Sequence, residues 1–207
     1  MPEVPRAGLT PQVVVDLALA VVDEGGTSGW ANLGLSAVAQ RAGVAVPSLY
    51  KHVDGLPALR SAVAARCVDD LAAVMTAAVT GPAADPTLDP VAAAGKGPNA
   101  TLTGAAAVRA LAIAIRAYAL AHPGRYRAVQ GAETAALGPA SSGPVDLVAR
   151  AVRELGLPPD RWVDQVRTVR AAVHGFVELE LGGGFGLPED VEASFRYLVE
   201  TVVTGLR

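Results

Sequence analysis

Hydrophobic and polar residues alternate along most of the chain with the period of an α-helix. The first such stretch begins at Thr10, which can cap a helix, and Pro11, which suits the first helical turn because no N–H is needed there. Gly25 and Gly26 end the pattern. Its apolar face consists of Val14, Leu17, Ala18, Val21 and Val22. The pattern therefore predicts a helix with one buried face between Pro11 and Gly25.

Two shorter helices are expected after a loop that reaches Gly34. The apolar face of the first is formed by Leu35, Val38, Ala39 and Ala42. Gly43 closes this helix at a position that favours a positive φ. Pro47 opens the second, which is expected to run to about His52 or Val53. Two short helices joined by such a turn are typical of a helix-turn-helix unit, whose second helix lies in the DNA major groove.

The same period predicts a larger helical body behind this unit. The expected helices lie at 56–79, 103–122, 125–132, 145–155, 159–181 and 189–206. Residues 80–102 and 138–144 are rich in proline, glycine or serine and are expected to form loops. No convincing strand pattern occurs. The fold is therefore predicted to be all-α, with a three-helix domain at 1–55 joined by a long helix to a helical domain at 56–207.

Composition agrees with closely packed helices and narrows the function classes. Of 207 residues, 51% are hydrophobic but only 4% are aromatic, so small aliphatic side chains must build the core. The formal net charge of −3 gives no sign of bulk nucleic-acid binding, but an average can hide a local patch. Arg109 and Arg116 interrupt the most apolar stretch, 105–121, which favours a core helix over a membrane span. Cys67 is expected to be buried, and the N-terminus does not resemble a signal peptide, which predicts a cytoplasmic protein.

The second short helix divides into an inner and an outer face. Leu49 and Val53, four residues apart, would point into a small core. The outer residues are Pro47, Ser48, Lys51 and His52, with Tyr50 at the edge. A lysine can reach a phosphate or a guanine edge, a proline ring can touch a thymine methyl, and serine, tyrosine and histidine can hydrogen-bond phosphates. This face suits a DNA groove, and it is also compatible with an ordinary solvent-exposed face.

Residues 9–80 resemble the TetR family of bacterial transcriptional repressors. The resemblance is carried by "LSAVAQRAGVAVPSLYKHVDGLPAL" and, toward the C-terminus, by "AAVHGFVELELGGGFG", whose His174-Gly175 pair marks one class of C-terminal domain in that family. It implies a homodimeric repressor that binds a palindromic operator in double-stranded DNA and responds to an unknown small-molecule effector bound by residues 56–207. The DNA contacts are expected from Ser36, Pro47, Ser48, Tyr50, Lys51 and His52.

The resemblance also implies that the last two long helices of each subunit form a four-helix interface. An unbroken apolar stripe in 189–206 agrees with this, because such a stripe needs a partner. The expected interface residues are Phe195, Leu198, Val199, Val202 and Val203. The alternative is that the stripe packs on the helical body of its own chain.

A small-molecule pocket is expected inside the C-terminal helices. Its candidate lining residues are Tyr118, His122, Tyr126, Trp162, His174 and Phe176. Each has a structural alternative, because aromatic residues can fill a core, His122 precedes a Pro-Gly helix stop, and His174 beside Gly175 can serve close helix packing. No cofactor, metal or membrane partner is expected.

Two departures from the family pattern bear on DNA contact. Ala45 stands where a capping serine or threonine is common, and losing such a cap costs about 1 kcal/mol. Asp54, Gly55, Leu56 and Pro57 open the long helix, where a phosphate-binding basic residue is common. Through residue 60, four basic and five acidic residues give a net charge of −1. We therefore expect modest affinity with a shallow dependence on salt.

Enzymatic functions find little support in the sequence. It has no G-x-S-x-G nucleophile motif, no G-x-x-x-x-G-K phosphate loop and no His/Cys/Asp cluster at metal spacing. The glycine-rich Leu181–Gly186 follows a helix, not a strand, and is interpreted as a flexible joint. The main alternative to a DNA-binding regulator is a helical small-molecule-binding dimer that has lost DNA binding.

Overall fold

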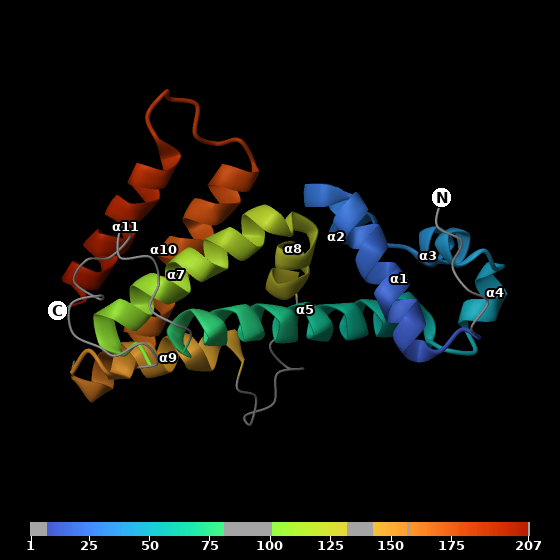
Figure 1. Ribbon diagram of the computed structural model, residues 1–207, viewed down its shortest axis with the longest axis horizontal. Coiled ribbons are helices and arrows are strands. Elements are labelled where there is room, and N and C mark those ends of the chain that lie inside the picture. Colours follow the sequence, from blue (N-terminus) through green and yellow to red (C-terminus); the bar gives the residue numbers. More distant parts are fainter. Residues whose placement is uncertain (1–7, 81–100, 132–142, 157, 207) are drawn as a thin grey trace. The chain divides into compact units, whose positions relative to one another are not determined.

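The computed structural model describes residues 8–80, 101–131, 143–156 and 158–206 (Figure 1). Within these ranges the regular structure is entirely helical, which confirms the predicted all-α class. The chain forms two compact units, of which unit 1 comprises Met1–Val68 and His122–Ala136, and unit 2 comprises Asp69–Ala121 and Leu137–Arg207. The long helix α5, Gly55–Thr80, contributes residues to both units.

Unit 1 is built around helix α1. Its helices, besides the first part of α5, are α1 (Pro11–Glu24), η1 (Gly26–Ser28), α2 (Gly29–Asn32), α3 (Leu35–Ala42), α4 (Val46–Leu49) and α8 (Pro123–Gly131). The hydroxyl of Thr10 accepts a hydrogen bond from the backbone N–H of Val13 at 3.2 Å, which confirms the predicted cap. The fully buried core residues include Val14, Val22, Val38, Leu49 and Leu59. Burying each such side chain contributes about 1.5–3 kcal/mol, so α1 holds α3, α4 and α5 through aliphatic packing.

The loop expected before Gly34 contains two short helices, η1 and α2. Gly29 at the start of α2 lies against the backbone of α1, where an added Cβ would stand 1.9 Å from the carbonyl oxygen of Val22. Arg60 of α5 closes α2, because its guanidinium donates hydrogen bonds to the carbonyl oxygens of Trp30, Ala31 and Leu33 at 3.3, 2.9 and 3.2 Å. The segment is therefore helical through contacts with distant parts of unit 1.

Helix α8 belongs to unit 1 although about 100 residues separate it from α1. Gly124 is buried against α1, and Arg125 binds the carboxylate of Asp23 through bonds of 2.8 and 2.5 Å. Arg127 donates a hydrogen bond to the carbonyl oxygen of Thr27 at 3.1 Å. Unit 1 is therefore larger than residues 1–55, and the predicted division at residue 55 stays a prediction about functional domains.

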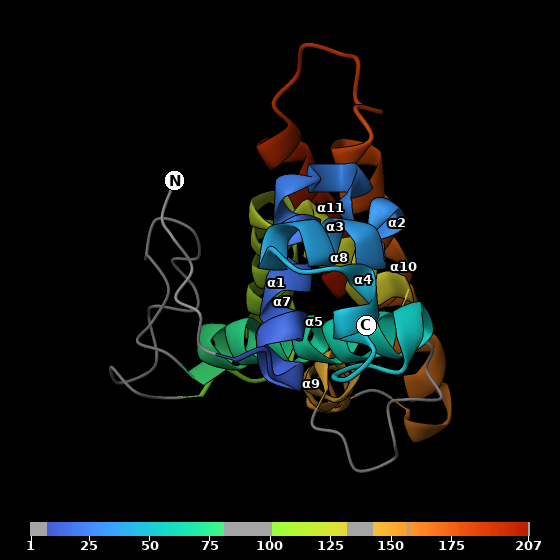
Figure 2. The same cartoon turned by 90° about the vertical axis from the view of Figure 1, so that its right-hand side faces the viewer.

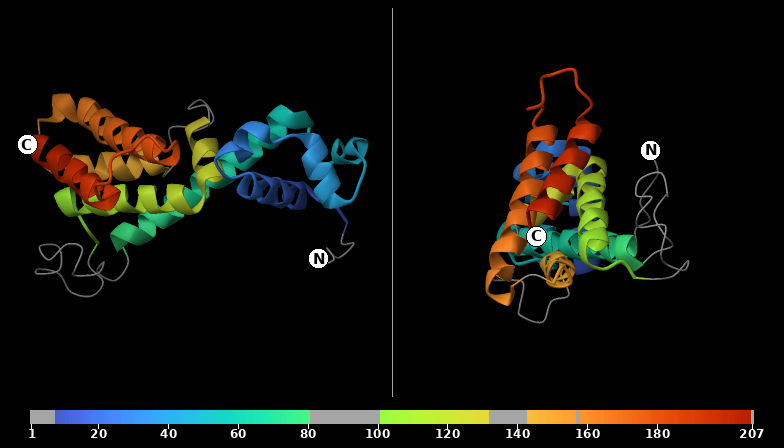
Figure 3. Two further views of the ribbon diagram at one scale, coloured as in Figure 1. Left: turned by 90° about the horizontal axis from the view of Figure 1, so that it is seen from above. Right: turned by 90° about the vertical axis from the view of Figure 1, so that its left-hand side faces the viewer.

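Unit 2 packs four longer helices around aliphatic side chains. They are α7 (Gly104–Ala121), α9 (Pro144–Arg153), α10 (Trp162–Leu181) and α11 (Val191–Gly205), with the short η3 (Pro159–Arg161) before α10. The right-hand view of Figure 3 shows α10 and α11 running beside each other, and both contact α7. The boundaries agree with the predicted helices to within a few residues. The predicted loops at 80–102 and 138–144 lie mostly outside the described residues.

Helix α7 is long and apolar enough, by length and composition alone, to cross a membrane. Nine of its residues are buried in unit 2, as predicted for a core helix. Its two arginines face glutamates of neighbouring helices: Arg109 binds Glu200 of α11 at 2.6 Å, and Arg116 binds Glu180 of α10 at 2.7 Å. Arg116 also donates to Glu192 of α11. The charges that interrupt the apolar sequence therefore tie α7 to α10 and α11.

Candidate nucleic-acid interface

The turn between α3 and α4 has the geometry that its sequence predicts. Gly43 has φ +67°, in the left-handed region that favours glycine. The N–H of Val44 donates to the carbonyl oxygen of Ala39 at 3.0 Å, and the N–H of Gly43 donates to that of Gln40 at 3.2 Å. These bonds satisfy the end of α3 and set the direction of α4. Ala45 offers α4 no side-chain cap, as expected from its missing oxygen.

Helix α4 is shorter than predicted, but a hydrogen-bonded turn extends it toward Val53. It covers Val46–Leu49 and is followed by a turn, in which the N–H groups of His52 and Val53 donate to the carbonyl oxygen of Leu49 at 2.8 and 3.0 Å. Leu49 is fully buried and Val53 packs partly against the same core. The inner face of the predicted recognition segment is therefore anchored as expected, and Figure 2 shows α3 and α4 next to each other.

The outer face of this segment is accessible. Tyr50 is 57% exposed, Pro47 and Lys51 are exposed, and Ser48 and His52 are half-buried. Ser36 is exposed in the first turn of α3, which Gly34 precedes without a side-chain cap. The structure thus places all six predicted DNA-contact residues on the surface of α3, α4 and the following turn.

Positive charge on this surface is scarce. Arg41 is paired with Glu24 at 2.6 Å, and Arg60 is occupied by the carbonyl groups at the end of α2. Lys51 has no hydrogen bond or ion pair among the residues that the structure describes, so its ammonium group is available to a ligand. Its compact charge matches a phosphate oxygen.

The predicted pocket residues are divided between the two units. His122 and Tyr126 lie in unit 1, where Tyr126 is fully buried, whereas the other four lie in unit 2. Trp162 packs under the guanidinium of Arg153, 4.3 Å from its ring centroid. Phe176 contacts the rings of Phe185 and Phe195, with centroid distances of 4.6 and 5.1 Å. Trp162 and Phe176 are half-buried and pack against these neighbours, and the six pocket residues stay a prediction.

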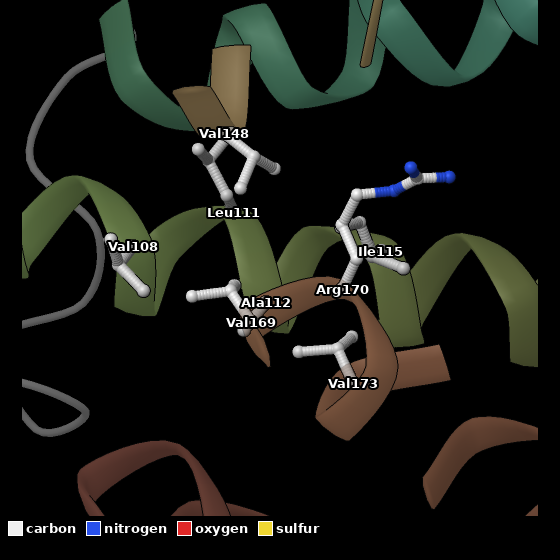
Figure 4. A pocket seen from close by; sticks show the side chains of 8 residues that line it. All are labelled: Val108, Leu111, Ala112, Ile115, Val148, Val169, Arg170 and Val173. Carbon is white, nitrogen blue, oxygen red and sulfur yellow. The ribbon is translucent and has the colours of Figure 1, made fainter. Parts of the chain in front are cut away.

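A different set of residues surrounds a cavity in unit 2, between α7, α9 and α10. It is lined by Val108, Leu111, Ala112, Ile115, Val148, Val169, Arg170 and Val173 (Figure 4). None of the six predicted pocket residues is among them. Their aliphatic side chains recur at helical spacing and look like ordinary core positions in the sequence, so only Arg170 could have marked the site.

Comparisons with known proteins identify the family. Residues 108–202 match the family model described as "Tetracyclin repressor-like, C-terminal domain". The chain is 30% identical to the uncharacterized HTH-type transcriptional regulator YobS of Bacillus subtilis, over 98% of this chain and 95% of YobS. The chain belongs to the TetR family of HTH-type transcriptional regulators. This confirms the family and the regulatory function predicted from the sequence, and members of the family are regulators, not enzymes.

Solved structures share the TetR-family fold. A protein of unknown function from Rhodococcus sp. RHA1 has a TM-score of 0.72 and 23% identity, with 98% of both chains covered. A variant of TetR from Acinetobacter baumannii AYE, solved in complex with minocycline, has a TM-score of 0.62 and 19% identity, with 96% of both chains covered. These likenesses support the all-α architecture along nearly the whole chain.

The stripe predicted as the dimer interface of this TetR-family protein lies largely in its own core. Phe195, Val199 and Val203 are only 1, 6 and 1% exposed within a single chain, so they pack mainly against their own helices. Leu198 and Val202 are half-buried. The three buried residues therefore pack within their own chain, as the alternative stated for the stripe has it, and the dimer interface stays a prediction.

Proposed function

We propose that this protein binds double-stranded DNA as a homodimer, represses transcription in the cytoplasm, and responds to a small molecule bound in unit 2. The observation that carries the proposal is the accessible outer face of α4 and its following turn, which is anchored by the buried Leu49 and presents the exposed Lys51. In a helix-turn-helix dimer, two such faces enter successive major grooves on one side of the duplex. Lys51 would meet a phosphate or a guanine, and Tyr50 and His52 would hold the register by phosphate contacts.

The Tyr50→Ala and His52→Ala variants are expected to bind DNA less tightly without losing stability. Each variant removes one hydrogen bond per subunit, about 1 kcal/mol, so a dimer would lose roughly 30-fold in affinity. The measurement is an electrophoretic mobility shift on the DNA upstream of the protein's own gene, with urea unfolding of each variant as a check. Gln12→Ala, on the exposed face of α1, is the matched control and should leave binding unchanged.

The salt dependence of DNA binding tests how many positive charges of the protein contact phosphates. Lys51→Met should make the slope of log K against log salt shallower by about 2 for a dimer, one phosphate per subunit. Full DNA binding by the Tyr50 and His52 variants, or a wild-type slope of about −8 or steeper, would contradict the proposed contact surface. Absence of any DNA complex would favour the second candidate function, a small-molecule-binding dimer, which the pairing of Arg41 and Arg60 within the protein supports.

We propose that the dimer face is the exposed side of α10 and α11. Leu179 and Tyr197 are 54% and 76% exposed, which is unusual for such large apolar groups. Ala171 and Gly175 lie on the exposed side of α10, and no atom of the described protomer stands within 4 Å of a Cβ added at Gly175. Small residues beside large exposed apolar ones allow helices of two subunits to approach closely, so we assign the four-helix interface to this face.

Leu179→Glu and Tyr197→Glu are expected to convert the dimer to a monomer. A glutamate in a desolvated helix interface would lie without a partner, and this costs several kcal/mol for the two subunits together. Sedimentation velocity at micromolar concentration measures the change. Leu120→Glu alters a 44% exposed leucine on α7 and is the control; dissociation by this variant, or dimers that persist in both test variants, would place the interface elsewhere.

A further inference from the structure

The guanidinium of Arg60 lies at the end of α2, just before the chain enters α3. Its Nη2 atom donates to the carbonyl oxygens of Trp30, Ala31 and Leu33 at 3.3, 2.9 and 3.2 Å. These carbonyl groups belong to the last turn of the helix and its C-cap, which have few partners within so short a helix. Arg60 therefore supplies a side-chain cap from α5, 27 to 30 residues further along the chain.

Helix α2 depends on contacts of this kind because it is too short to be stable alone. It has four residues, whereas an isolated helix needs about 12 or more to be even marginally stable in water. Within the described chain its start has no side-chain cap. Leu33, the C-cap residue, is only 2% exposed and packs in the core of unit 1. The buried leucine and Arg60 together therefore set the position at which the backbone leaves α2.

The start of α3 follows from that position. Gly34 is the one residue between the capped carbonyl of Leu33 and the first residue of α3, Leu35, and its backbone is extended. Because glycine has no side chain to cap α3, the start of this helix is not fixed by its own cap. Ser36, one of the proposed DNA contacts, lies exposed in the first turn of α3. A shift at the end of α2 would therefore move Ser36 directly.

The guanidinium of Arg60 is committed to the protein and is not held ready for a phosphate. Arg60 is half-buried, and its Nε atom is enclosed with no hydrogen-bond partner in the part of the chain that the structure describes. The guanidinium also lies 5.2 Å from the centroid of the Trp30 ring. That ring is held by α8, because a Cβ added at Gly131 would stand 3.0 Å from the indole Nε1. Contacts with α2 and its indole ring therefore fix the Arg60 side chain.

We propose that Arg60 is a positioning residue for DNA binding, which holds the end of α2 so that Ser36 meets the duplex. The inference rests on the proposed function, since it takes the outer face of α3 and α4 as the DNA-contact surface. A positioning residue and a phosphate contact have different consequences for salt dependence. Loss of an arginine that neutralises a phosphate makes the slope of log K against log salt shallower by about 2 for a dimer. Loss of a positioning arginine lowers affinity and leaves the slope unchanged, because the serine that it places carries no charge.

Three variants of α5 test this role by mobility shift at several salt concentrations. Arg60→Met keeps an apolar stem but removes the donors, and should weaken DNA binding by about tenfold or more, since a hydrogen bond is lost in each subunit. Arg60→Lys restores a charged group with three donors and should bind within about threefold of wild type. Arg66→Met removes an equal charge from the same helix, where the exposed Arg66 pairs with Asp16 at 3.9 Å, and should change affinity less than threefold. Circular dichroism at the assay temperature establishes that each variant is folded.

Coupling to Ser36 distinguishes positioning from a general loss of stability. In a Ser36→Ala background, Arg60→Met should cost less than threefold, because both changes remove the same contact. In a Tyr50→Ala background, the full loss of about tenfold should persist. Fluorescence supplies a readout without DNA: in a Trp162→Phe background Trp30 is the remaining tryptophan, so Arg60→Met should shift its emission and Arg60→Lys should restore it.

The outcomes separate this inference from the proposed function. Wild-type affinity in Arg60→Met, a slope shallower by about 2, or the full loss in the Ser36→Ala background would each overturn the positioning role. If Tyr50→Ala weakens the complex while Arg60→Met leaves it unchanged, this inference alone is rejected. If the wild-type protein forms no DNA complex, the proposed function is rejected and the positioning role with it.

Discussion

Replacing Arg116 by methionine is expected to destabilise the protein by about 3 kcal/mol, the lower end for a buried pair, because the change leaves a largely buried carboxylate without its partner. The Nε and Nη2 atoms of Arg116 each donate to the carboxylate of Glu180 at 2.7 Å, and the two side chains are only 12 and 17% exposed. The guanidinium also lies 5.0 Å from the ring centroid of Phe195. The hydrogen bonds with Glu180 raise the pKa of Arg116, against the opposing effect of burial, and Glu192 adds to the rise. Urea unfolding followed by circular dichroism measures the loss.

Two further variants distinguish the largely buried pair of Arg116 and Glu180 from an exposed ion pair. Adding Glu180→Gln to Arg116→Met removes the orphaned charge and should recover a substantial part of the stability, a coupling that a double-mutant cycle quantifies. Arg109→Met breaks the pair with Glu200, whose side chain is 54% exposed, and should cost about 1 kcal/mol or less. Equal losses for Arg116→Met and Arg109→Met would show that burial does not set the strength of these contacts.

Local chemistry allowed several elements to be predicted from the sequence. Thr10 caps α1 and Gly43 adopts its positive φ because each requirement depends on a few neighbouring residues. The helical period likewise located the boundaries of α7, α10 and α11. The exposed position of Tyr50 and Lys51 followed from the burial of Leu49, since successive residues on a short helix must point in different directions.

Features that depend on distant residues could not be predicted in this way. Helix α2 forms where Gly29 meets the backbone of α1, and α8 joins unit 1 through the contact between Arg125 and Asp23, which are 102 residues apart. The apolar period of α11 identified a buried face, but nothing in the sequence shows that this face packs within its own chain. The cavity was missed for the same reason, because Val148 and Val173 differ from ordinary core residues only in what lies opposite them.

The second large effect is expected at Gly124, where alanine should destabilise unit 1 by about 1–3 kcal/mol. The added Cβ would stand 2.6 Å from the carbonyl oxygen of Val22 and 2.8 Å from that of Gly26. Both are backbone atoms, so neither can move without displacing the end of α1. Alanine is otherwise the better helix former by about 0.5–1 kcal/mol, so the sign of the change distinguishes steric conflict from helix propensity. Thermal and urea unfolding of the variant give that sign.

Gly205→Ala is the matched control, because Gly205 ends α11 and no described atom stands within 4 Å of its added Cβ. This change is expected to be neutral or slightly stabilising, within about 0.5 kcal/mol. The two alanine variants should also differ in DNA binding. Val22 packs in the same core as Val38 and Leu49, so a displaced α1 would move the residues that anchor α4. Unchanged stability of the Gly124→Ala protein would contradict this prediction. It would mean that α8 can move away from α1 with little loss of stability, and that unit 1 keeps α4 in place without the contact between α8 and α1.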